Sequence, residues 1–181
     1  NHTLHLVAMA RAVGYLLTWE DMAQVSSVTP LLTRIYPNGS ADVNHFHVAG
    51  GMSFLVRELI DAGLVHADVR TIWGDSLADY AREPLLIDGS LQWRDAPSES
   101  AELDVLRPVA DPFTADGGLR LLKGNLGKAI IKVSAVAPEH QVVEAPARVF
   151  ASQDEFAVAF KAGELKRDVV VVLRFQGPDA N

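Results

Sequence analysis

Histidines are the first side chains in this sequence whose type and spacing suit chemistry. His2 and His5 lie three residues apart, so on a helix they would share one face. His45 and His47 lie two residues apart and follow Asp42 closely. Imidazole and carboxylate groups are common metal ligands, but no third ligand stands at a known metal spacing and the HExxH pattern is absent. Ordinary surface or core histidines explain the same residues, and we expect no metal site.

A glycine-rich segment over residues 117–128 is the second candidate, and it reads Gly-Gly-Leu-Arg-Leu-Leu-Lys-Gly-Asn-Leu-Gly-Lys. Glycines 124 and 127 would let backbone N–H groups converge on an anion, and Lys123 and Lys128 would add positive charge. Neither a Walker A loop nor the GxGxxG dinucleotide fingerprint is present. A plain glycine-rich turn is the alternative interpretation.

Gly50 and Gly51 form a third candidate directly after the second histidine pair. Two glycines permit a sharp corner whose exposed N–H groups open the next helix, where anions bind. A simple helix–helix corner is the interpretation we favour, because such corners often contain glycine. No Gly-x-Ser-x-Gly elbow is present, so the sequence does not indicate a serine hydrolase.

Composition excludes several classes of protein. The chain has 181 residues, a net charge of −7 and no cysteine. Without cysteine it has no disulfide, no thiolate zinc site, no cysteine nucleophile and no cysteine ligands of its own for an iron–sulfur cluster. No basic block indicates nucleic acid as a partner. No apolar run reaches the roughly 18 residues of a membrane-spanning helix, and we expect a cytoplasmic protein. Because the chain opens on Asn inside a helical pattern and stops in mid-turn, we expect an internal fragment of a longer protein.

The elements that position these residues predict an α/β fold with a mainly helical first half and a β-rich second half. Apolar spacing and caps predict four main helices, over residues 3–13, 18–28, 42–48 and 53–62. A brief strand is expected at 69–73 and a short helix at 75–82, and a proline-rich linker at 88–116. Strands are then expected at 119–123, 129–136, 142–149 and 168–175, the last buried on both faces. One helix at 154–161, capped by Ser152, interrupts them.

Taken in order, these segments resemble the dihydroxy-acid dehydratase and 6-phosphogluconate dehydratase family. The resemblance covers essentially the whole chain. Its matching segments are residues 1–8, 21–32, 37–39, 47–51, 57–64, 121–127, 132–136 and 175–178. Two further stretches, Asp42–His47 and Val105–Pro108, look like the 6-phosphogluconate branch of the family.

The resemblance implies two domains. Residues 1–95 would be the C-terminal part of the α/β domain that carries the iron–sulfur cluster. Residues 96–181 would contain a linker and the start of a β-barrel-like domain. The active site would form between these domains, in a homodimer or a larger oligomer.

The resemblance also implies a hydro-lyase that turns 6-phosphogluconate into 2-keto-3-deoxy-6-phosphogluconate, a step of the Entner–Doudoroff pathway. In the family a cysteine-bound 4Fe–4S cluster acts as the Lewis acid on the departing hydroxyl, and a divalent metal such as Mg²⁺ helps to hold the carboxylate. The cluster cysteines, the metal carboxylates and the proposed serine base all match positions outside this chain. We therefore expect no catalytic residue and no metal ligand within it, and no activity from the isolated chain. The remaining candidates for substrate contact or support are His45, His47, Lys123 and Asn125.

Three alternatives stay open at this point. The first is a dihydroxy-acid dehydratase or another sugar-acid dehydratase. The second is a non-catalytic α/β module that binds anions through residues 124–127. The third is a metalloenzyme that uses His45 and His47.

Overall fold

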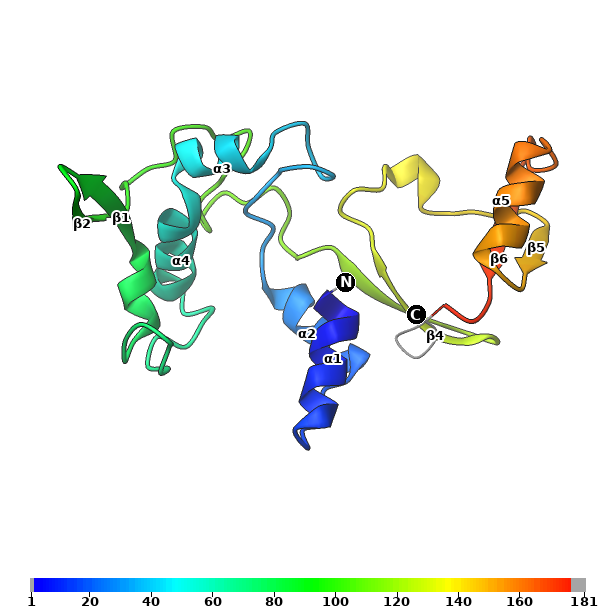
Figure 1. Cartoon of the computed structure of the whole chain (residues 1–181), viewed down its shortest axis with the longest axis horizontal. Coiled ribbons are helices and arrows are strands. Elements are labelled where there is room, and N and C mark those ends of the chain that lie inside the picture. The colour runs from blue at the N-terminus through cyan, green and yellow to red at the C-terminus, as the bar shows by residue number, and fades with distance from the viewer. Residues whose placement is uncertain (1, 177–181) are drawn as a thin grey trace.

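The computed structural model describes residues 2–176. Its elements form three groups that follow one another along the molecule (Figure 1). Helices α3 and α4 lie with the hairpin β1–β2 at one end, α1 and α2 lie with β3–β4 in the middle, and α5 lies with β5 and β6 at the other end. Within residues 2–176 no helix is long and apolar enough to cross a bilayer.

Five α-helices form where apolar spacing and capping signals predict them. Their bounds are α1 His2–Ala12, α2 Trp19–Val28, α3 Val43–Ala49, α4 Gly51–Asp61 and α5 Gln153–Lys161. The start of α2 carries a capping box, in which the Thr18 hydroxyl accepts from the Asp21 N–H at 3.2 Å and the Asp21 carboxylate accepts from the Thr18 N–H at 2.8 Å. Ser152 caps α5 in a similar way, since its hydroxyl accepts from the Glu155 N–H. The predicted helices are therefore confirmed to within about two residues at each end.

The strands form three separate two-stranded sheets. These are β1 Arg82–Ile87 with β2 Ser90–Asp95, β3 Leu119–Gly124 with β4 Gly127–Lys132, and β5 Ala147–Phe150 with β6 Val170–Leu173. The first two pairs are antiparallel and the third is parallel. Short 3₁₀ turns occupy Leu77–Ala81 and Pro138–His140. The α/β class is confirmed, whereas the strands of residues 2–176 close no barrel.

Four sequence-based expectations are wrong in detail. The strand expected over 129–136 is β4, which ends at Lys132. No strand forms at 69–73, because the Thr71 N–H donates to the Gly74 carbonyl at 2.8 Å and closes a turn there. The strand expected over 142–149 is confined to β5, from residue 147. The strand expected over 168–175 shortens to β6 and is not buried on both faces. Val170 and Val171 are 36% and 41% exposed, since β6 pairs only with β5 in the described part of the chain.

The expected linker at 88–116 is largely structured. Its first residues belong to the β1–β2 hairpin, whose turn is Asp88-Gly89 with φ of 50° and 75°. Val105 and Leu106, further along, are 3% and 0% exposed and form the main core with Ala49 and Phe54. Residues 31–35 run beside this segment, with the Arg34 N–H donating to the Val105 carbonyl at 2.8 Å. The segment therefore packs against α3 and α4 instead of spanning open space.

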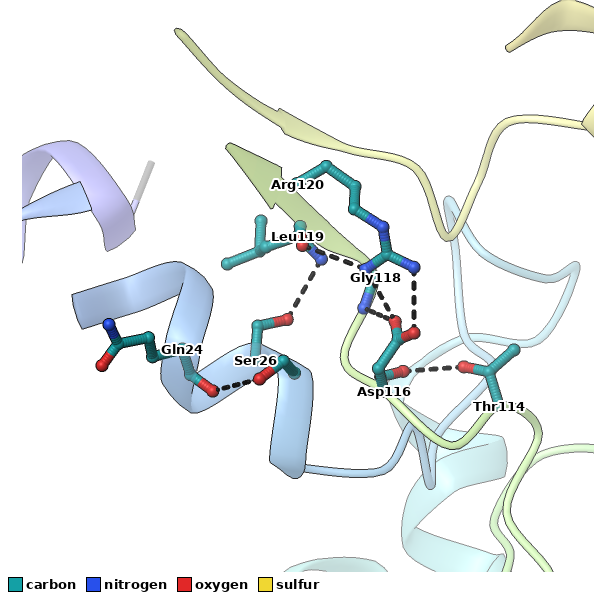
Figure 2. Close-up of polar contacts among 8 residues, drawn as sticks. Gln24, Ser26, Thr114, Asp116, Gly118, Leu119 and Arg120 are labelled. Carbon is teal, nitrogen blue, oxygen red and sulfur yellow. Dashed lines mark hydrogen bonds and ion pairs between the residues drawn. The ribbon is translucent and has the colours of Figure 1, made fainter. Parts of the chain in front are cut away.

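The two halves of the chain meet where α2 touches the start of β3 (Figure 2). Ser26 is 7% exposed, and its hydroxyl accepts a hydrogen bond from the Leu119 N–H at 3.1 Å. The Ser26 carbonyl accepts from the Gly117 N–H at 2.8 Å. A Cβ atom at residue 117 would lie 2.8 Å from the Ser26 hydroxyl oxygen, so only glycine allows this approach. We call this contact the α2–β3 joint.

Candidate functional site

The α3–α4 corner positions the two histidines that the sequence singles out. Asp42 is the N-cap of α3, and its carboxylate accepts from the backbone N–H groups of Asn44 and His45. The His45 Nδ1 lies 2.8 Å from the same carboxylate. Hydrogen bonds from His45, first from its backbone and then from its ring, lower the pKa of Asp42. The same Nδ1 also lies 3.3 Å from the Asp42 backbone nitrogen, so the ring contacts both the carboxylate and the N–H of the residue that caps α3.

His45 borders a polar hollow of about 420 Å³. Its walls also include Arg34, Ser40, Glu102 and Asp104. This mixture of hydroxyl, carboxylate and guanidinium groups suits a small polar molecule. The ring itself is about half exposed, and the structure gives it a capping role at α3.

His47 lies two residues further along α3 and borders a different, mainly apolar hollow of about 500 Å³. Its Nε2 lies 3.5 Å from the Glu83 carboxylate of β1, and the same carboxylate receives Arg94 of β2 at 2.5 Å. The Glu83 side chain is only 14% exposed, so two cationic or polar partners offset its burial. Ser53 and Arg82 also border the hollow, and most of its other walls are aromatic or apolar: Phe46, Met52, Trp73, Tyr80, Pro84 and Trp93.

Gly50 and Gly51 serve the corner itself. Their φ angles are 140° and 62°, in the region that favours glycine. A Cβ atom at residue 50 would lie 2.9 Å from Cβ of Phe54, in the core. Backbone conformation and packing thus account for both glycines, and the helix–helix corner is the interpretation that the structure supports.

Lys123 and Asn125 belong to the β3–β4 hairpin. Lys123 is the second-last residue of β3 and lies directly opposite Lys128 of β4. Asn125 lies in the two-residue turn between the strands, beside Leu126, which is 96% exposed. Lys128 forms an ion pair with Glu20 at the start of α2. The hydrogen bond from Lys128 is the main reason that the pKa of Glu20 lies below its usual value.

The four predicted contact residues do not form one cluster in this chain. His45 and His47 share α3 but face different hollows, and the hairpin that carries Lys123 and Asn125 lies apart from α3 (Figure 1). No group of three or more His, Asp or Glu side chains within the described residues is placed to hold a metal ion. The absence of cysteine from the sequence leaves no thiolate for an iron–sulfur cluster, so the residues present do not fit that group.

Sequence reasoning missed the Glu83–Arg94 pair and the Trp73–Trp93 stack, whose rings lie 4.1 Å apart between centroids. Both depend on the β1–β2 hairpin, which pairs Glu83 directly with Arg94. The signal was the dipeptide Asp88-Gly89, a strong marker of a two-residue hairpin turn. Reading that turn would have placed these two charged side chains opposite each other.

Comparison with known families places this geometry in context. Residues 1–80 match the model described as Dihydroxy-acid/6-phosphogluconate dehydratase N-terminal, and residues 104–181 match its C-terminal counterpart. The chain belongs to this dehydratase family. Only residues 81–103, which include the β1–β2 hairpin, fall outside both matches.

Similar members of the dehydratase family share the whole length of the chain. It is 62% identical to the phosphogluconate dehydratase of Pseudomonas aeruginosa and 53% identical to that of Escherichia coli (strain K12), over 181 residues in both cases. It is 34% identical to the dihydroxy-acid dehydratase of Caldanaerobacter subterraneus over 180 residues, or 98% of the chain. The chain spans 30% of the length of each of these curated relatives.

Proposed function

We propose that this chain is part of a hydro-lyase that dehydrates 6-phosphogluconate to 2-keto-3-deoxy-6-phosphogluconate, in the Entner–Doudoroff pathway of the cytoplasm. The supporting observation is a difference in sequence identity between two groups of relatives, measured over the same 180–181 residues of this chain. Relatives named phosphogluconate dehydratase are 53–62% identical in two cases, whereas the relative named dihydroxy-acid dehydratase is 34% identical. A dihydroxy-acid dehydratase is the second candidate, because the family models cover both activities.

Within that protein, the described residues would supply scaffold and substrate contacts. We propose that a 4Fe–4S cluster and a divalent metal such as Mg²⁺ are held by sequence outside this chain, and that the whole protein is a homodimer. The cluster would supply Lewis acidity. The chain itself contributes polar groups around His45, the Glu83–His47 contact and the cationic end of the β3–β4 hairpin. The isolated chain is accordingly expected to bind no iron stoichiometrically and to turn over no sugar acid.

A segment exchange tests the proposed reaction. These 181 residues would replace the matching segment of the Pseudomonas aeruginosa phosphogluconate dehydratase. The match to that enzyme includes every residue of this chain. We expect the chimera to dehydrate 6-phosphogluconate and to leave a branched dihydroxy acid unchanged. The matched control carries the corresponding segment of the Caldanaerobacter subterraneus dihydroxy-acid dehydratase. A folded, cluster-loaded chimera that dehydrates only the branched dihydroxy acid would contradict the proposal.

A further inference from the structure

Two lysines face each other at the end of the β3–β4 hairpin. Lys123 and Lys128 are direct partners in the antiparallel register, so their side chains leave the same face of the hairpin. Directly opposite residues have Cβ atoms about 5 Å apart, and like charges in that position destabilise a strand pair. The arrangement is unexpected in a chain whose net charge is −7. An unfavourable pair of this kind suggests a role outside the packing of the hairpin.

One carboxylate offsets part of this charge. Glu20, in the first turn of α2, pairs with Lys128 and also lies close enough to Lys123 to feel its charge. Lys123 itself forms no ion pair with any described residue. Glu20 supplies one negative charge for two positive ones, so the end of the hairpin keeps an excess of positive charge.

Gly124 lies next to Lys123. Among the described glycines it is the one for which neither backbone conformation nor packing within the chain requires the absence of a side chain. Its φ lies outside the left-handed region, and a Cβ atom there would meet nothing within 4 Å. Every other described glycine has either a positive φ or a neighbour that a Cβ atom would touch, and Gly127 across the turn has a φ of 115°. Glycine weakens a strand, and within strands it often marks a place where a ligand or another backbone approaches closely.

We propose that the end of the β3–β4 hairpin binds a phosphomonoester dianion, with the ammonium groups of Lys123 and Lys128 as its charged contacts and Gly124 as the gap that admits it. Each lysine ammonium group offers three donors that can reorient around a phosphoryl group, and the two lysines leave one net positive charge once Glu20 is counted. The exposed turn of Asn125 and Leu126 leaves the approach open. That the ester is the 6-phosphate of a sugar acid rests on the proposed function, whereas the site itself does not.

Titration of the 181-residue chain tests the site directly. Isothermal titration with 6-phosphogluconate and with gluconate should show saturable binding of the first and at least about ten-fold weaker binding of the second. Lys123→Gln and Lys128→Gln should each weaken 6-phosphogluconate roughly ten-fold. Lys132→Gln is the matched control, because Lys132 lies on the same face of the same strand as Lys128 but opposite Leu119, without a lysine partner. It should leave the affinity within about two-fold, because a charge four residues along the strand lies about 13 Å away, beyond the Debye length of about 10 Å at 0.1 M salt.

Gly124→Ala separates ligand access from folding. The added methyl group meets nothing in the chain, so the thermal midpoint should not fall, while the affinity for 6-phosphogluconate should drop several-fold. Equal losses in all three lysine variants would show a general charge effect and overturn the proposal. Unchanged affinity in Lys123→Gln and Lys128→Gln, or no binding to the chain, would also overturn it.

The same variants in the Pseudomonas aeruginosa chimera separate this site from the proposed function. Turnover of 6-phosphogluconate with an unchanged KM in Lys123→Gln and Lys128→Gln would remove the site and keep the function. Binding of inorganic phosphate that depends on both lysines, in a chimera that dehydrates only a branched dihydroxy acid, would keep the site and remove the function.

Discussion

The α3–α4 corner and the α5 end of the molecule use similar side chains with different outcomes. At the corner, Phe54 and Leu106 are 1% and 0% exposed, because segments about fifty residues apart in the sequence close over each other. At the other end, Phe150 and Ala159 are buried, but Phe160 stays 66% exposed. The corner buries Phe54 and Leu106 with its own chain, although Val48 and Met52 stay exposed there, whereas the α5 end has no fully buried large side chain among the described residues.

The total accessible surface of the chain also indicates incomplete burial. The chain exposes 13149 Å², whereas a compact monomer of 19.6 kDa would expose about 8,600 Å². A two-stranded sheet such as β5–β6 is marginal on its own, and parallel pairs usually lie covered on both faces. The comparison of the two ends shows that similar helices and strands can bury their apolar side chains to different degrees. Stability within this chain should therefore concentrate at the corner.

The largest expected effect is a core truncation at the corner. Phe54→Ala should lower the free energy of unfolding by about 3–5 kcal/mol, because it removes a fully buried ring and leaves a cavity beside Leu106. Phe160→Ala, on the exposed side of α5, should lower it by less than about 1 kcal/mol. Urea unfolding followed by tryptophan fluorescence measures both, since Trp73 and Trp93 line the hollow next to α4. Equal losses would mean that contacts absent from the described chain bury Phe160.

A smaller effect is expected at the α2–β3 joint, which couples the two regions. Ser26→Ala removes the acceptor of the part-buried Leu119 N–H and should cost about 1–2 kcal/mol. Ser27→Ala is the matched control, because the Ser27 hydroxyl is exposed and donates to the Gln24 carbonyl. Its effect should stay within about 0.5 kcal/mol. Hydrogen exchange of the Leu119 amide should speed up in the first variant alone, and unchanged exchange would show that the joint does not depend on this bond.

The same contrast explains what the sequence predicted well. Helix starts at Thr18, Asp42 and Ser152 depend on side chains within three residues of the backbone that they cap, so a single sequence contains all the information. Family membership was also readable, since ordered motifs run through the whole chain. The assignment of residues 1–95 and 96–181 to two domains stays a prediction.

The rest depends on contacts that a local pattern does not carry. Val105 and Leu106 lie in a proline-rich stretch whose composition predicts a linker, and only the approach of residues 31–35 and of α4 buries them. His47 acquires its partner Glu83 from a hairpin 36 positions away along the chain. Substrate contact by His45, His47, Lys123 and Asn125 likewise stays a prediction, because those residues face separate surfaces of the chain.

The smallest expected effect is a pH dependence at the joint. A hydrogen bond from Arg120 at 2.9 Å is the main cause that lowers the pKa of Asp116 below its ordinary 3.8, and the Gly118 N–H adds to it (Figure 2). A folded-state pKa below the unfolded one gives stability that is complete above pH 3.8 and is lost as the pH falls through the folded-state pKa. Because Arg120 is about half exposed, the contribution should stay within about 0.2–1 kcal/mol and shrink with added salt.

Asp116→Asn isolates this contribution from the other carboxylates that titrate in the same range. The free energy of unfolding of Asp116→Asn should lie below that of the unchanged chain at pH 6, and the two should converge toward pH 2 as Asp116 becomes protonated. Asp75→Asn is the matched control, because Asp75 also pairs with an arginine but is 92% exposed, with Arg70 88% exposed. It should change nothing measurable at either pH. If Asp75→Asn and Asp116→Asn behaved alike, the Asp116–Arg120 ion pair would be no more than a surface contact, and the α2–β3 joint would depend on Ser26 and Gly117 alone.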